Sequence, residues 1–213
     1  MKKLMLIVFL FLSAFIWTGC YNADAGEFMS EHTKIVFAGE GAVGQCLISV
    51  GEREDPYIVD GIHTTNTGFS LVVFKPSVSL QVSDIDVVLV VDGESNQMLL
   101  ELNPVNMTYI GDLGYSLGED SDLSVIFQNE TIVMSDVSKN FATTHQDAIK
   151  QGFNVVKEEC FFEKEEKYEC YLKIIEGERF GGTGYFWCYT VITQTRSSKN
   201  VLINALTGEI FLG

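Results

Sequence analysis

Residues 85–102 read IDVVLVVDGESNQMLLEL, and they carry the clearest fold signal in the chain. β-branched and aliphatic residues fill both halves, and the tetrapeptide Asp92-Gly93-Glu94-Ser95 between them has the composition of a turn. Two apolar runs separated by a short Asp-Gly turn are typical of a β-hairpin. The stretch therefore predicts antiparallel strands at 87–91 and 97–102.

The same pattern extends in both directions from this hairpin, and no segment before residue 137 keeps a helical period. A second hairpin is expected at 125–128 and 131–134, around Asn129-Glu130. Short strands at a spacing of roughly 8–12 residues predict an antiparallel, immunoglobulin-like β-sandwich over residues 34–138. The other expected strands are 34–38, 43–50, 68–75, 78–82, 85–91, 107–110, 123–128 and 131–135.

The pattern changes near residue 139, where a short helix is expected. Thr143 and Gln146 have the spacing of a capping box, and Ile149, Phe153 and Val156 form an apolar stripe at i, i+4 and i+7. Strands then return at 159–162, 168–175, 185–195, 200–204 and 209–212. One helix followed by an antiparallel meander predicts a small α+β domain over residues 139–213.

Two motifs in this last third resemble the PepSY family, whose members are small helix-plus-sheet modules of exported bacterial proteins. Residues 144–149 read THQDAI, like the family's helix opening, and YFWCYTV at 185–191 followed by VLINALTGEI at 201–210 resembles its closing hairpin. The preceding β-region, with Phe37, Gly39 and Glu40 before a strand, more faintly resembles Ig-like modules of bacterial lipoproteins. The resemblance implies binding of a protein or peptide and modulation of an extracytoplasmic protease.

The N-terminus has the layout of a secretory signal at residues 1–19. Lys2 and Lys3 precede an apolar run at 4–17, which is too short for a comfortable membrane span. Gly19-Cys20 resembles the lipobox of bacterial lipoproteins, which implies lipidation of Cys20 and a polar tether at 20–33. The alternative is cleavage after Ala25, which would release a secreted protein. The expected location is therefore the extracytoplasmic face of the cell membrane, or otherwise the extracellular medium.

The net charge of the chain excludes some classes of binding partner. Loss of Lys2 and Lys3 with the signal leaves 12 basic residues against 29 acidic ones, a net charge of about −17. Binding to nucleic acid is not expected, because phosphates require basic residues. Repulsion from anionic lipids leaves the anchor as the only expected contact with the membrane.

Four cysteines follow Cys20, and in an exported chain an even count predicts disulfides. Cys160 and Cys170 are equidistant from Glu165, so a hairpin turning at 164–166 would place them opposite each other. Cys188 is the alternative partner of Cys170, across a hairpin through the loop at 181–184. If Cys160 pairs with Cys170, Cys188 either joins Cys46 or stays reduced.

A dinucleotide-type motif occurs at residues 35–46, IVFAGEGAVGQC, with Asp60 about 20 residues further on. Gln45 and Cys46 stand where a P-loop needs its phosphate-binding lysine and its Mg²⁺-binding hydroxyl. The region also lacks the crossover helices of a nucleotide-binding fold. We interpret the motif as a glycine-rich bend between two strands, and we expect no nucleotide cofactor.

No catalytic or metal-binding set of residues stands out. His32, His63 and His145 are expected in the tether, a turn and the helix cap, and no nucleophile signature is present. The acidic segments 52–55 and 118–122 could supply oxygen ligands for Ca²⁺, but 118–122 lacks the twelve-residue spacing of a Ca²⁺-binding loop and is interpreted as a solvated turn. The cysteines lack a C-x-x-C pair for zinc.

The sequence therefore predicts a non-enzymatic cell-envelope lipoprotein. Its Ig-like stalk would present a PepSY-like module to an unknown protein or peptide partner. The alternative function is that of a secreted soluble inhibitor or immunity-type binding protein.

Overall fold

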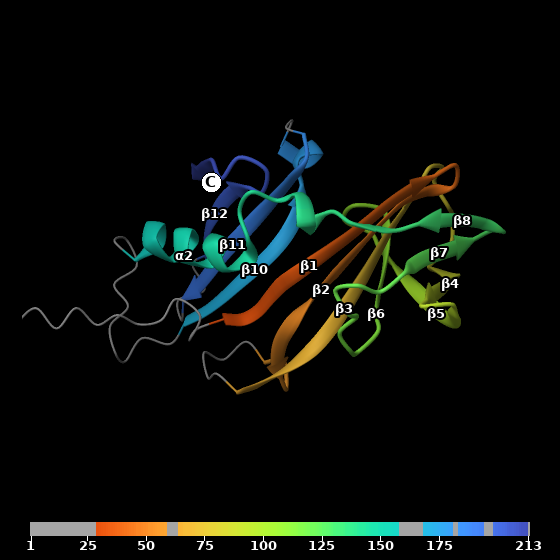
Figure 1. Cartoon of the computed structure of the whole chain (residues 1–213), viewed down its shortest axis with the longest axis horizontal. Helices are drawn as coiled ribbons and strands as arrows, with labels where there is room; N and C mark the ends of the chain where they lie inside the picture. The colour runs from red at the N-terminus through yellow and green to blue at the C-terminus, as the bar shows by residue number, and fades with distance from the viewer. Residues whose placement is uncertain (1–28, 59–63, 158–167, 181–182, 194–197, 213) are drawn as a thin grey trace, which may run out of the picture.

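The computed structural model describes residues 29–58, 64–157, 168–180, 183–193 and 198–212 (Figure 1). Its thirteen strands lie in one sheet, ordered β13-β12-β11-β10-β1-β2-β3-β6-β5-β4-β7-β8, with β9 also paired to β1. The prediction of a mainly β protein with a helix in its last third is confirmed. The strands are β1 (Met29–Gly41), β2 (Gly44–Asp55), β3 (Thr65–Pro76), β4 (Asp84–Val91), β5 (Glu94–Asn103), β6 (Thr108–Asp112), β7 (Leu123–Phe127), β8 (Glu130–Val133), β9 (Ser135–Asp136), β10 (Tyr168–Glu176), β11 (Tyr185–Thr193), β12 (Ser198–Asn204) and β13 (Ile210–Leu212). The helical segments are η1 (Ser138–Asn140), α2 (His145–Val156) and η2 (Gly177–Phe180).

Both predicted hairpins of the β-rich region are present. Strands β4 and β5 pair antiparallel around Asp92 and Gly93, which have positive φ angles of 51° and 85°. Strands β7 and β8 pair around Gln128 and Asn129, with φ angles of 51° and 66°. Two consecutive left-handed residues form the tight turn whose twist matches that of the flanking strands.

The predicted strand at 78–82 is wrong. This stretch connects β3 to β4 and pairs with no strand of the described structure. Val78 and Val82 are exposed, and only Leu80 packs against the core. Alternating apolar residues favour a strand only where a neighbouring strand can accept the backbone hydrogen bonds.

The first core lies inside the curled part of the sheet from β1 to β8. Residues of β8 and of the segment after it meet β1, and Phe37 and Ala38 pair with Asp136 and Ser135 of β9. The side chains enclosed in this way are almost entirely apolar. The largest fully buried ones are Phe37, Ile48, Phe74, Leu89, Leu100, Tyr109, Leu123 and Ile132.

The second core lies between α2 and β10–β12. The predicted stripe on α2 is confirmed, because Ile149 and Val156 are buried and Phe153 packs against the same core. The predicted cap is one residue off: Thr144, not Thr143, accepts a hydrogen bond from the Asp147 backbone at 3.2 Å. Thr143 is buried instead, and its carbonyl accepts a hydrogen bond from Trp187 Nε1 at 2.8 Å.

Strand β1 belongs to both halves of the molecule. It is antiparallel to β2 and parallel to β10, with Met29 opposite Cys170 and His32 opposite Leu172. Residues 29–33, expected in the tether, are therefore the first residues of a strand. Met29 and Val36 of β1 belong to the second core, together with residues of α2 and β10–β12. The sheet is continuous across the predicted boundary at 138/139.

Candidate functional site

A groove opens where β1 and β10 separate. The two strands are paired only at residues 29–32 and 170–172, and beyond this point they diverge (Figure 1). The groove has a volume of about 310 Å³, and residues 173–176 of β10 lie along it. Its opposite wall comes from β2, β3 and β6, so both halves of the chain contribute to one cavity.

The walls of the groove are largely apolar. Leu47 of β2 lies opposite Val73 of β3, and Leu71 is two residues away on the same face of β3. The neighbouring residues Cys46, Phe74 and Val72 belong to the first core on the other face of the sheet. The groove therefore lies on the outer face of β2 and β3.

Two ion pairs join the halves at the rim of the groove. Lys173 Nζ of β10 lies 2.9 Å from Glu31 Oε1 of β1, and the Glu31 side chain is only 10% exposed. Lys75 Nζ of β3 lies 3.4 Å from Glu178 Oε2 of η2, where both side chains are exposed. Glu176 also lines the groove, and it forms no ion pair in the described structure. The rim thus carries one uncompensated carboxylate.

A polar cluster adjoins the Glu31 end of the groove. The Tyr171 hydroxyl donates to the buried carboxylate of Glu169, and the Tyr57 and Tyr171 rings meet edge to face at 6.4 Å. Burial and the hydrogen bond to Glu169 hold the pKa of Tyr171 well above its usual range. Burial, aided by the charge of Glu31, raises the pKa of Tyr57 to about 12. Both phenols therefore remain neutral hydrogen-bonding groups at physiological pH.

Two histidines that we expected to be unrelated lie together. His32 of β1 and His145 at the start of α2 stack with ring centroids 6.1 Å apart. Lys34 Nζ lies 2.5 Å from Glu52 Oε1, and His32 Nε2 lies 3.9 Å from the other oxygen of Glu52. Burial and the charge of Lys34 outweigh the attraction of Glu52, so the pKa of His32 falls to about 4. Burial, followed by the charge of Lys34, also lowers the pKa of His145. His32 and His145 are therefore both uncharged at neutral pH. The third histidine, His63, lies outside the described residues.

The cysteines occupy different environments. Cys20 and Cys160 lie outside the described residues, so lipidation and the Cys160–Cys170 disulfide remain predictions. Cys170 lies opposite Val191, and Cys188 lies three residues before Val191 on β11. Cys170 and Cys188 therefore face opposite sides of the sheet, which excludes a disulfide between them in this register.

Cys46 and Cys188 both have free thiols. No disulfide joins these two cysteines in the described structure. Burial raises the pKa of the Cys46 thiol to about 12 and also raises that of Cys188. Neither thiol is an activated nucleophile.

The dinucleotide-type motif forms a β-hairpin, as interpreted. Gly41 of β1 pairs with Gly44 of β2, and Gln45 and Cys46 already lie within β2. A helix N-terminus, which a phosphate site of this type requires, does not follow the motif. Gly39 has a packing role, because a side chain there would lie 2.5 Å from the Val133 carbonyl.

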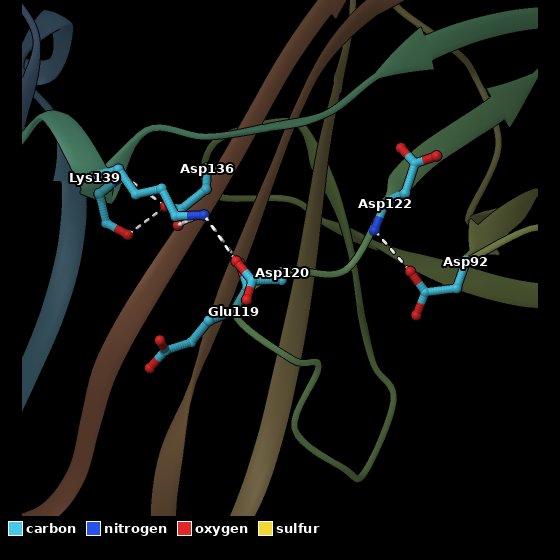
Figure 2. A network of polar contacts seen from close by, with 7 residues as sticks. Asp92, Glu119, Asp120, Asp122, Asp136 and Lys139 are labelled. Atoms are coloured by element: carbon cyan, nitrogen blue, oxygen red, sulfur yellow. Dashed lines mark hydrogen bonds and ion pairs between the residues drawn. The ribbon is translucent and has the colours of Figure 1, made fainter.

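The acidic segment 118–122 is a loop that is held in place by contacts with its neighbours (Figure 2). Lys139 Nζ lies 3.3 Å from Asp120 Oδ1 and 3.7 Å from Asp136 Oδ2, and it donates to the Glu119 carbonyl at 3.5 Å. Asp92 Oδ1 accepts the Asp122 backbone hydrogen at 2.8 Å. The loop is thereby tied to η1 and to the β4–β5 turn.

Among the residues that the structure describes, no group of three or more His, Cys, Asp or Glu side chains is arranged to hold a metal ion. The described residues also include no helix that is long and apolar enough to cross a membrane.

Comparison with known proteins identifies no relative: no protein-family model, no curated protein and no solved structure matches this chain. The resemblances to PepSY and Ig-like modules therefore remain predictions.

The groove and the histidine pair could not be found from the sequence. His32 and His145 are distant in the chain, and they meet because α2 packs over the sheet that β1 extends. The alternating apolar and polar residues of β2 and β3 indicate that each strand has two different faces. They do not indicate that β10 lies beside the outer face of these strands.

Proposed function

We propose that this protein is a non-enzymatic binding protein of the cell envelope, anchored through Cys20, which holds a protein or peptide partner in the groove between β1 and β10. The observation that carries the proposal is the groove itself. It is the place where both halves of the chain contribute apolar walls and charged rim residues to one concave surface.

The composition of the groove supports binding. Ligand sites are typically concave, mostly apolar and equipped with a few polar groups that orient the ligand. Leu47, Leu71 and Val73 supply the apolar surface, while Lys173 and Glu176 supply polar groups at the β10 side. Its volume of about 310 Å³ is near the lower end of the usual range, about 300–1,000 Å³. A short segment of a partner therefore fits better than a large cofactor.

The location part of the proposal is supported by residues 1–19, which have the basic start and apolar run of a secretory signal, and by the lipobox-like Gly19-Cys20 that follows. An anchored protein would stay close to the membrane, where modulation of an envelope protease is a fitting role.

Site-specific photo-crosslinking tests the binding site. A photoreactive side chain at Leu71, within the groove, should capture a discrete envelope polypeptide. The same group at Leu99, which is 53% exposed on β5 and outside the groove, should not. Equal capture at both positions, or none at Leu71, would show that the groove is not the binding site.

The anchor is tested separately by fractionation and by mass spectrometry of the mature N-terminus. Cys20→Ala should move the protein from the membrane fraction to the soluble fraction. A wild-type protein that begins at Gly26 would instead support the secreted inhibitor or immunity-type binding protein.

A further inference from the structure

We propose that the partner enters the groove as an extended polypeptide strand, which adds to the edge of β10 at residues 173–176 and carries a basic side chain that balances Glu176. This inference rests on the proposed binding function of the groove. It specifies the backbone conformation of the partner and its charge.

The first observation is that β10 loses its neighbour partway along. On one side β10 pairs with β11 over its whole length, from Tyr168 to Glu176. On the other side β1 pairs with residues 170–172 only. Further along, β1 pairs with β2 and β9, and its Val36 carbonyl accepts the Val137 backbone hydrogen at 2.9 Å. No described strand therefore pairs with residues 173–176 on the side where β1 departs.

The second observation concerns the backbone groups of that stretch. In an antiparallel ladder, alternate residues direct their N–H and C=O groups toward the partner strand and the others direct them away from it. Half of residues 173–176 consequently direct these groups away from β11, toward the groove that the same residues line. An open strand edge of this kind is a template for the addition of another strand.

The groove fixes the size and pattern of such a strand. Four residues of β10 cover about 13 Å at about 3.3 Å per residue, so the partner contributes a segment of similar length. Its alternate side chains would face the wall formed by Leu47, Leu71 and Val73. These positions favour apolar residues, and the intervening ones remain near the charged rim.

The charged residues that line the groove indicate which side chain the partner strand carries between its apolar residues. Three carboxylates and two ammonium groups line the groove, and the pairs Glu31–Lys173 and Glu178–Lys75 leave Glu176 without a counter-ion. The full chain carries a net charge of −15, which adds a long-range attraction for cations. A lysine or arginine in the partner strand is therefore favoured, and an acidic residue there is disfavoured.

The other strand ends are poorer templates. β13 has three residues, and Ile210 and Phe211 are exposed and lie outside the groove. β8 has four residues, and the chain continues from it directly into β9, which pairs with β1. The β10 edge combines unpaired backbone groups with an apolar wall and a carboxylate.

The test uses labelled peptides and the full chain in detergent, with fluorescence anisotropy as the readout. The parent probe is acetyl-Val-Lys-Val-Lys-Val-amide, and the charge control replaces both lysines with glutamates. Two further probes carry N-methyl groups on the amides of odd or of even residues. We expect the parent to bind about tenfold more tightly than the glutamate probe. One N-methylated probe should lose about tenfold in affinity and the other should not, because only alternate amides face β10.

Variants and hydrogen exchange locate the binding. Glu176→Gln should weaken the parent probe about threefold or more, while Glu209→Gln, at an exposed position outside the groove, should leave it unchanged. Bound probe should slow amide exchange within 173–176 and not within 210–212. Equal affinity of the two N-methylated probes, no binding of the parent probe, or protection at 210–212 would overturn strand addition. Capture at Leu71 would then still support the groove as a binding site, whereas loss of that capture would remove both proposals.

Discussion

Replacement of Gly152 by alanine tests the packing of α2 against the sheet. Glycine in a helix interior is normally unfavourable, and alanine is better by about 0.8–1 kcal/mol. Judged from helix propensity alone, Gly152→Ala should stabilise the protein. In the structure, however, a Cβ at this position would lie 2.3 Å from Tyr189 Cγ and 2.6 Å from Tyr189 Cβ.

The size of the packing effect follows from where the clash occurs. The atoms involved are at the base of the Tyr189 side chain, which is fully buried in the second core and lies on the central strand β11. A rotation at the end of a flexible side chain cannot relieve this clash, so the helix or the strand must move. Overpacking of a core costs about 1–3 kcal/mol, and contacts this short favour the upper part of that range. The net expectation is a loss of about 1–2 kcal/mol.

Urea unfolding followed by circular dichroism measures this balance. With a slope of about 2 kcal/mol per molar urea, the midpoint should fall by roughly 0.5–1 M. Lys150→Ala is the matched control, because Lys150 lies on the exposed face of the same helix and its replacement should change stability by less than about 0.5 kcal/mol. A higher midpoint for Gly152→Ala would refute the reasoning, since it would mean that α2 does not approach β11 as closely as described.

The cap of α2, the buried His32 ring and the buried Cys46 thiol give three further predictions. Thr144→Ala should cost about 1 kcal/mol in urea unfolding through loss of the helix cap, and Thr144→Ser should restore most of it; no difference between them would contradict the cap assignment. The folded-state pKa of His32, about 4, lies below its value of about 6.5 in an unfolded chain, so the unfolded state binds more protons between these values. The free energy of unfolding should therefore fall as the pH drops from about 6.5 to 4. The fall should be larger in the wild type than in His32→Gln, by up to about 3 kcal/mol. If the two proteins lose the same stability over this pH range, the ring is not held neutral. Cys46 should react with iodoacetamide only after unfolding, because its thiol is buried and its pKa is raised to about 12. The half-buried Cys188 should react slowly in the folded protein. Mass spectrometry measures both reactions, and rapid labelling of Cys46 in the folded protein would contradict its burial.

Local sequence determined the elements whose hydrogen bonds and turns are short-range. The Asp92-Gly93 turn and the apolar runs beside it suffice for the β4–β5 hairpin, because the turn residues adopt positive φ and bring the strands into register. The apolar stripe on α2 likewise predicted which face of the helix is buried. The position of the cap was predicted one residue early, because both Thr143 and Thr144 suit a cap and the choice depends on Trp187.

Long-range pairing decided the rest. The parallel contact of β1 with β10 joins residues about 140 positions apart, and no turn signal or periodicity encodes it. That contact turns residues 29–33 from an expected tether into a strand, places His32 beside His145 and opens the groove along residues 173–176. Apolar patterning shows that a strand has a buried face, but which strand lies beside it depends on how all the faces are buried at once. The sequence alone therefore determined the hairpins, the helix and the acidic character of this protein, whereas the candidate binding site exists only through the tertiary arrangement of β1, β10 and the outer face of β2 and β3.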